Sequence, residues 1–195
     1  MTWSLTNNMR ALIFFEPGTE ITEFFAPVDI LHRAGVFTEI LTHDSNGRSL
    51  PSLSKVVDNV AYASEACKRL ENGEYDVVII PGGKLGVKRI KDHYSYFDDG
   101  LLVHHAMGKL IAAICAAPSI LGEMGILKEK KYTCYPGWES SSFGGTYTGK
   151  EIEIDKNLIT ARSMYYSTDF GLAIVEYLLG KEKRIEIERQ VKGIK

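Results

Sequence analysis

The residue with the clearest chemical potential is Cys115, which follows the apolar run 109–114 and precedes Ala116, Ala117 and Pro118. A continuous apolar run of this length is typical of a buried strand, and small residues after it permit a sharp turn into a helix, as in the nucleophile elbow of hydrolases. A thiol at a helix N-terminus has a lowered pKa, and the thiolate is the nucleophilic form. The position predicts a reactive cysteine, although an inert, packed cysteine is an equally good interpretation of the position alone.

A second candidate is the pair Gly82 and Gly83, which follows the β-branched run 76–80 and Pro81. Glycines directly after a buried strand let backbone N–H groups point into a site, where they can stabilise an oxyanion or bind an anion. Taken alone, the pair is better explained by an ordinary turn from strand to helix. The phosphate-binding patterns G-x-x-x-x-G-K-[ST] and G-x-G-x-x-G do not match this segment.

Glu23 is a third candidate, because it lies near the start of an expected helix over 20–34. An acidic residue there is commonly a partner of the helix dipole, and Glu20 would serve equally well. The five histidines show no metal-ligand spacing, and we expect most of them at the surface. We expect Cys67 to be a packing residue and Cys134 to lie in a strand.

The elements that must position these residues alternate between strand and helix. We expect strands at 10–15, 36–42, 76–80 and 109–114, and helices at 20–34, 64–72, 94–107, 117–124 and 167–179. The stretch 43–63 is turn-rich and suggests a small hairpin, 131–160 suggests short strands with a hairpin at 151–160, and a charged helix closes the chain. Alternation of this kind predicts a mostly parallel sheet with helices on both faces, with the site at the carboxyl ends of its strands.

Composition supports a single soluble domain over residues 9–195, after a disordered lead at 1–8. The chain has 195 residues, 45% hydrophobic and 25% charged, with a formal net charge of -2. This charge argues against nucleic acid as a partner, and we expect no membrane span and no secretion signal. Three cysteines without C-x-x-C spacing favour free thiols, no metal site and a cytoplasmic location.

Four segments together resemble the ThiJ/PfpI superfamily, in the branch of the Parkinsonism-associated protein. They are EITEFFAPVDILHRAG (20–35), YDVVIIPGGKLG (75–86), LIAAICAAPSILGEMGIL (110–127) and DFGLAIVEYLLGKE (169–182). The resemblance runs from Met9 to about Lys183. It implies a flavodoxin-like three-layer α/β sandwich that forms a homodimer.

The resemblance also assigns roles to the candidate residues. It makes Cys115 the reactive cysteine and Glu23 a protonated acid that hydrogen-bonds the thiolate, which favours the charged form of the sulfur. The backbone amides at Gly82, Gly83 and Ala116 would face a substrate oxygen. Glu23, which position alone leaves as a dipole partner, thereby becomes a catalytic candidate.

Two departures from the family pattern alter the expected pocket. Tyr135 stands where relatives carry a histidine, and a tyrosine with a pKa near 10 can donate a proton but is a poor base. The family's S-R-G-P-G-T loop reads Ala-Arg-Ser-Met-Tyr-Tyr from position 161. We therefore expect this loop, with Arg162, Met164 and Tyr165, to be bulkier than the family's and to change the shape of the pocket.

The resemblance implies a cofactor-independent enzyme that acts on small reactive carbonyls or glycated groups, of the glyoxalase or deglycase type. An alternative is a redox sensor or chaperone that works through oxidation of Cys115 and has no turnover. The amidase or peptidase branch is a weaker alternative, because Ala116 stands where that branch has a histidine. A flavin is not expected, because the loop after the first strand lacks a hydroxyl-rich phosphate cradle.

Overall fold

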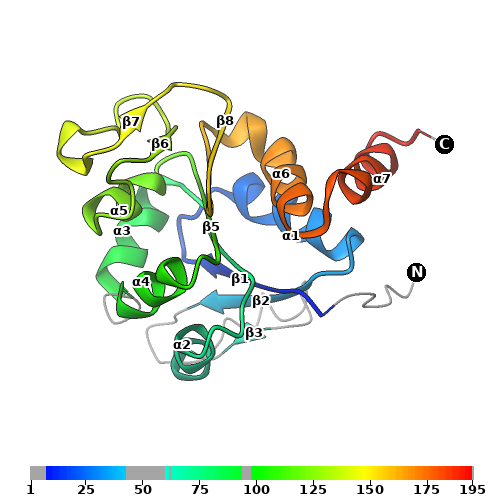
Figure 1. Ribbon diagram of the computed structural model, residues 1–195, viewed down its shortest axis with the longest axis horizontal. Helices are drawn as coiled ribbons and strands as arrows, with labels where there is room; N and C mark the ends of the chain where they lie inside the picture. The colour runs from blue at the N-terminus through cyan, green and yellow to red at the C-terminus, as the bar shows by residue number, and fades with distance from the viewer. Residues whose placement is uncertain (1–7, 43–59, 62, 94–97, 195) are drawn as a thin grey trace.

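The computed structural model describes residues 8–42, 60–61, 63–93 and 98–194, and it is built on a seven-stranded sheet (Figure 1). The strands are β1 (Arg10–Phe15), β2 (Phe37–Thr42), β3 (Val60–Ala61), β4 (Val77–Ile80), β5 (Leu110–Ile114), β8 (Ile152–Asp155) and β9 (Leu158–Ala161). Their order is β3-β2-β1-β4-β5-β9-β8, and every neighbouring pair is parallel except β8 with β9. The antiparallel pair confirms the hairpin expected at 151–160. The lead expected at 1–8 and the hairpin expected at 43–63 lie mostly outside the described residues.

Helices cover both faces of the sheet, which confirms the flavodoxin-like three-layer arrangement (Figure 1). One face carries α1 (Ile21–Arg33), α6 (Ser167–Leu179) and α7 (Lys181–Val191). The other carries α2 (Ala63–Glu71), α3 (Lys84–His93), α4 (Asp98–Ala106) and α5 (Pro118–Glu123). Two short strands, β6 (Lys131–Tyr132) and β7 (Thr146–Tyr147), form a separate pair beside two 3-10 turns, Ser141–Phe143 and Met164–Tyr166.

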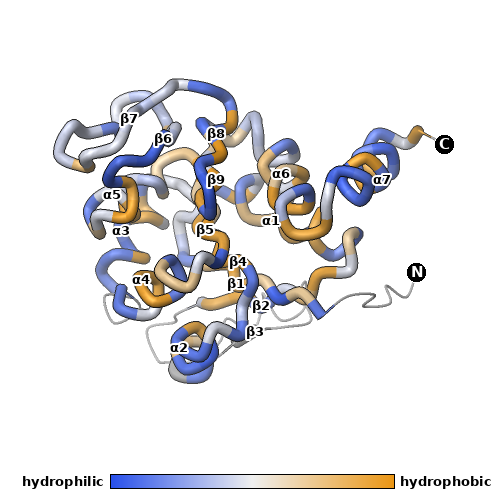
Figure 2. Tube along the Cα trace, in the orientation of Figure 1, coloured by the Kyte–Doolittle hydropathy of each residue, from blue (hydrophilic) through white to orange (hydrophobic). Residues whose placement is uncertain are grey.

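The central strands are buried on both faces, as their unbroken apolar sequences indicate. Every residue of β4 and of β5 has zero exposed surface. Figure 2 shows the same hydrophobic band running through the middle of the molecule. Covering helices remove both faces of such strands from water, and each fully buried Val, Leu or Ile side chain contributes roughly 1.5–3 kcal/mol.

The helix expected at 94–107 contains α4 at Asp98–Ala106, with residues 94–97 outside the described part of the chain, and a further helix, α3, precedes it that the sequence did not predict. The pattern of α3 is easily missed, because only Gly86, Val87 and Ile90 are buried on an otherwise polar helix.

His104 is an exception to the expectation that most histidines lie at the surface. It is fully buried, and its Nε2 lies 3.0 Å from the carbonyl oxygen of Leu110. No helix in the described part of the chain has the length and apolarity to cross a membrane.

Candidate active site

Cys115 lies on a tight turn directly after β5, with a backbone φ of 63°. The left-handed region is uncommon for a residue with a side chain and costs about 1–3 kcal/mol, so the surrounding structure must hold it. Two backbone hydrogen bonds do so. The N–H of Cys115 donates to the carbonyl of Ala161 at 2.9 Å, and the N–H of Tyr135 donates to the carbonyl of Cys115 at 2.8 Å. The expected elbow is therefore present and is fixed from two sides.

Glu23 projects from the first turn of α1 into the interior and has no exposed surface. Its Oε2 accepts the N–H of Gly82 at 2.8 Å and lies beside Cys115, while its Oε1 is buried without a hydrogen-bond partner among the described residues. A Cβ atom at Gly82 would lie 2.6 Å from that oxygen and 2.8 Å from Cβ of Cys115. Glycine is required at this position because it is what allows the acid and the thiol to meet.

Burial raises the pKa of Glu23 from the ordinary value of 4.5 to about 7. The hydrogen bonds from the Cys115 thiol and the Gly82 amide act in the opposite direction, and the charge of Glu20 adds to the rise. No cation is among the groups that shift this carboxyl in the described residues. Glu23 can therefore exchange a proton near neutral pH, as an acid–base catalyst must.

The thiol of Cys115 differs from the expectation of a lowered pKa. Burial raises its pKa to about 12, together with the charge of Glu23 and the hydrogen bond to it, while the amides of Ala116 and Gly83 lower it. The helix that was expected to stabilise a thiolate, α5, has only six residues. Loss of solvent around the half-buried sulfur outweighs so short a dipole.

The two groups act chemically as one unit that holds one exchangeable proton. A thiol beside a carboxylate and a thiolate beside a carboxylic acid differ only in which of the two neighbouring groups holds that proton. Near pH 7, Glu23 can accept the proton as the sulfur attacks an electrophile. The arrangement therefore suits general-base activation of a neutral thiol rather than a standing thiolate.

The expected amide donors do not all face the same group. The N–H groups of Gly83 and Ala116 are directed at the sulfur of Cys115. The N–H of Gly82 instead holds Glu23, so its expected role as an oxyanion donor is corrected to that of a positioning group. Gly83 has a φ of 92°, and a Cβ there would lie 2.7 Å from the backbone nitrogen of Glu20 and would also meet the carbonyl of Gly18.

The residues that depart from the family pattern also lie beside Cys115 along the backbone. Tyr135 reaches it through the backbone hydrogen bond described above, and its side chain is 48% exposed. Met164 and Tyr165 belong to a 3-10 turn that begins three residues after Ala161, the acceptor of the Cys115 N–H. Arg162 makes no hydrogen bond to Cys115 or Glu23 within the described part of the chain. Its guanidinium instead donates to the carbonyl of Gly149 at 3.0 Å.

Two features of this end of the sheet were not anticipated. Glu16, directly after β1, is fully buried and pairs with Nδ1 of His93 at 3.1 Å. Glu16 could have been recognised as a candidate site residue, because it is a polar residue immediately after a buried strand. No sequence pattern marks His93 in this way. The other cysteines behave as packing residues, and Cys67 is half-buried. Cys134 was expected in a strand but lies in the loop two residues after β6, where it is fully buried beside Glu139 and burial raises its pKa to about 12.

Comparisons with known proteins agree with this architecture. The sequence matches the DJ-1/PfpI family over residues 9–177. It is 35% identical over 181 residues to Protein dj-1beta of Drosophila melanogaster, covering 92% of this chain and 94% of that protein. It is 26% identical over 182 residues to the glutathione-independent glyoxalase DJ-1 of Schizosaccharomyces pombe, covering 90% of this chain and 94% of that protein.

Solved structures show the same relationship. The crystal structure of Drosophila melanogaster DJ-1beta superposes with a TM-score of 0.79 at 31% identity, covering 97% of this chain and all of that one. Oxidized Toxoplasma gondii DJ-1 superposes with a TM-score of 0.75 at 26% identity, covering 94% and 97% of the two chains. Because the match spans most of the sequence and the whole sheet with its covering helices, the chain belongs to the DJ-1/PfpI family.

Proposed function

We propose that the protein converts small 2-oxoaldehydes into 2-hydroxy acids, with Cys115 as the nucleophile and Glu23 as the acid–base group. The observation that carries the proposal is the proximity of a thiol on a strained turn to a carboxyl with no exposed surface, since a Cβ atom at Gly82 would contact both residues. The glyoxalase of Schizosaccharomyces pombe among the relatives supports the same reaction class. A glycated amine is a related substrate, because it presents the same carbonyl carbon to the sulfur.

The first step is addition of sulfur to the aldehyde carbon. As the carbon–sulfur bond forms, the thiol proton passes to Glu23, and the amides of Gly83 and Ala116 hold the new oxyanion. Glu23 then returns the proton to that oxygen, which completes a hemithioacetal. The carboxylate is thereby regenerated beside the carbon that must next lose a proton.

The second step is an internal oxidation and reduction that needs no cofactor. Glu23 removes the proton from the former aldehyde carbon and delivers it to the neighbouring ketone carbon. One further proton passes from the hydroxyl on the first carbon to the oxygen on the second, and the hydroxyl of Tyr135 is the candidate relay. The aldehyde carbon is oxidised to a thioester as the ketone is reduced to an alcohol, and water then releases the acid and the free thiol.

The test is formation of lactate from methylglyoxal by the wild type, Cys115→Ala and the matched control Cys67→Ala. Product is measured because any thiol consumes the aldehyde by reversible addition. Loss of the nucleophile is expected to lower kcat/KM at least ~10³-fold, whereas Cys67→Ala should stay within about twofold. Equal rates of lactate formation in the wild type and Cys115→Ala would contradict the proposal.

A second candidate function is peroxide sensing by Cys115, and the similarity to an oxidized DJ-1 structure favours it over the amidase alternative. Peroxide would convert the thiol to a sulfenic acid and, with a second equivalent, to a sulfinic acid, releasing one water each time. Peptide mass spectrometry after mild peroxide should show oxygen added to Cys115 before Cys67 and Cys134. Earlier oxidation of either other cysteine would exclude this role.

A further inference from the structure

Five apolar side chains are exposed on the segments that border Cys115, and we call them the apolar rim. They are Ile21, Leu85, Tyr135, Met164 and Tyr165. Tyr165 is 82% exposed and Ile21 is 66% exposed, while each of the other three is 48% exposed. Single exposed apolar residues are ordinary, but several on chain segments that border one site form a candidate surface for an apolar ligand.

Two parts of the rim are connected to Cys115 by backbone hydrogen bonds, and the other two lie on the chain segments that carry Gly83 and Glu23. Tyr135 donates its N–H to the carbonyl of Cys115, and the Met164–Tyr166 turn follows the strand that accepts the Cys115 N–H. On the opposite side, Leu85 follows Gly83, whose amide faces the sulfur. Leu85 also packs on Gly18, where a Cβ would lie 2.7 Å from its own Cβ. Ile21 begins the helix that carries Glu23.

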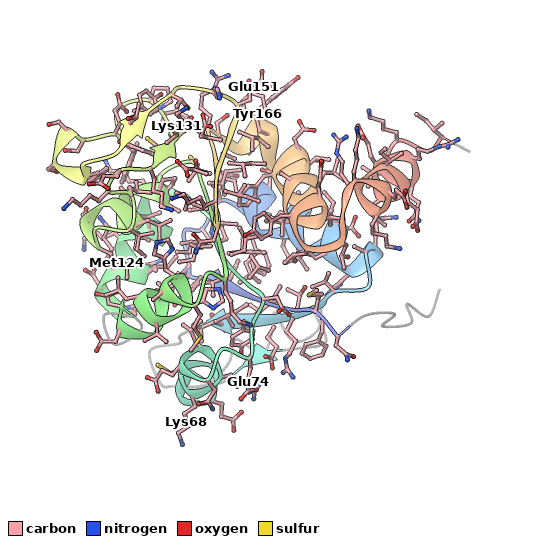
Figure 3. The ribbon with its side chains drawn as sticks, in the orientation of Figure 1. Lys68, Glu74, Met124, Lys131, Glu151 and Tyr166 are labelled. Carbon is pink, nitrogen blue, oxygen red and sulfur yellow. The ribbon has the colours of Figure 1, made fainter. Side chains whose placement is uncertain are left out.

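The Met164–Tyr166 turn is held by its own contacts before any ligand arrives. Arg162 binds the carbonyl of Gly149, donates to the hydroxyl of Tyr166 and lies 5.0 Å from the centre of that ring. Ser167 donates its hydroxyl to the carbonyl of Met164 at 2.7 Å. Figure 3 shows Tyr166 next to Glu151, whose carbonyl accepts the N–H of Arg162 at 2.9 Å.

These contacts determine which chemistry the turn can offer. The guanidinium of Arg162 is committed to a carbonyl and a phenol, so the turn presents a thioether and an aromatic ring instead of a positive charge. Tyr165 packs edge-on against Tyr166 at 5.1 Å between ring centres, which leaves the rest of its ring open to solvent. A surface fixed in this way binds without a large cost in ordering.

We infer that the apolar rim selects 2-oxoaldehydes whose ketone carbon carries an aromatic or bulky apolar group over those that carry a methyl group. This inference rests on the proposed function, because the aldehyde carbon must sit at the sulfur of Cys115. The substituent then extends outward across the rim. An aromatic ring there gains edge or offset contacts with Tyr165 and a sulfur contact with Met164, which methylglyoxal is too small to make.

The experiment compares kcat/KM for phenylglyoxal and methylglyoxal, each measured as hydroxy acid formed. Met164→Ala/Tyr165→Ala is compared with the matched control Met107→Ala/Tyr177→Ala, whose side chains are 52% and 42% exposed on other surfaces. The ratio of the two kcat/KM values is expected to fall about tenfold in the rim variant and to stay unchanged in the control, as for loss of an apolar substrate contact. Tyr165→Ser repeats the test with a single, highly exposed change that leaves folding intact.

Each remaining outcome decides between the two proposals. An unchanged ratio in both rim variants overturns the inference while leaving the proposed function standing. Failure of the wild type to exceed Cys115→Ala with either aldehyde removes the proposed function itself. Loss of a dimer on sedimentation, with the ratio unchanged, would assign the rim to contact with a second copy of the chain and overturn the substrate assignment.

Discussion

Two buried glutamates show how differently one fold can treat the same side chain. Glu39 in β2 is 7% exposed and accepts hydrogen bonds from Arg69 and Arg10, the latter at 3.2 Å. Burial acts to raise its pKa, but Arg69, Tyr75 and Arg10 together lower it. Glu23 is buried more completely, and it has a thiol and one amide in place of the arginines.

The difference is the presence or absence of a cation. With two arginines, Glu39 is a fixed charge that joins the start of β1 to α2. Glu23 has no neighbouring arginine, so desolvation disfavours its ionised form and raises its pKa until its proton is exchangeable near neutral pH. A perturbed carboxyl of this second kind, set beside a nucleophile, marks the site of chemistry.

The largest expected effect is on the pH dependence of stability in Glu23→Gln. The folded-state pKa of Glu23 is raised from 4.5 to about 7, so the wild type loses stability as the pH rises through this window. The loss amounts to about 3 kcal/mol, because one pKa unit is worth about 1.4 kcal/mol. Relative to the wild type, Glu23→Gln should therefore gain about 3 kcal/mol between pH 4.5 and pH 8, measured by urea unfolding at both values.

Glu39→Gln is the control for that measurement and should show the opposite sign. Its lowered pKa contributes stability that is present above the ordinary value of 4.5 and is lost as the pH falls through the folded-state value. The free energy of unfolding of the wild type should therefore be higher than that of Glu39→Gln at neutral pH, and the two values should converge in acid. If stability relative to the wild type changed with pH in the same way in both variants, the arginines would not be the cause of the difference between Glu23 and Glu39.

The next largest effect concerns the reactivity of Cys115 toward iodoacetamide. In the wild type, the rate should rise through about pH 7 as Glu23 loses its proton and becomes able to accept that of the thiol. In Glu23→Gln the thiol must ionise alone, and burial holds its pKa above the ordinary value of 9.0. We expect the rate at pH 8 to fall roughly 100-fold, a typical loss for a missing general base. If the pH profile of alkylation were unchanged in Glu23→Gln, Glu23 would not be the base that activates the thiol of Cys115.

The smallest expected effect is that of Glu39→Gln at pH 7. Arg69 and Arg10 would lose their carboxylate, but their side chains are 25% and 36% exposed and can reach water. We therefore expect a loss of about 2 kcal/mol in unfolding free energy, below the roughly 3–5 kcal/mol typical of breaking a fully buried ion pair. Lactate formation should stay within about twofold of the wild type, and a larger loss would extend the active site across the sheet.

Local sequence was sufficient to predict the parts of the site that depend on backbone chemistry. The apolar run into Cys115 and the small residues after it indicated the elbow, and the glycines at 82 and 83 indicated a close backbone approach. The strands 76–80 and 109–114 were equally clear, because burial on both faces requires unbroken apolar runs. Helix α3 was missed, because its buried stripe of three residues is too narrow to stand out.

Sequence alone therefore predicted the turn at Cys115 and the glycines beside it, the resemblance to the family added Glu23, and the tertiary structure decided how each behaves. Segments far apart in the chain exclude water from Glu23 and Cys115 together, and this raises both pKa values where the local helix predicted a lower one. The same packing turns the N–H of Gly82 toward the acid rather than toward a substrate. Solvent exclusion and amide direction are set by contacts between remote segments, so no local pattern can specify them.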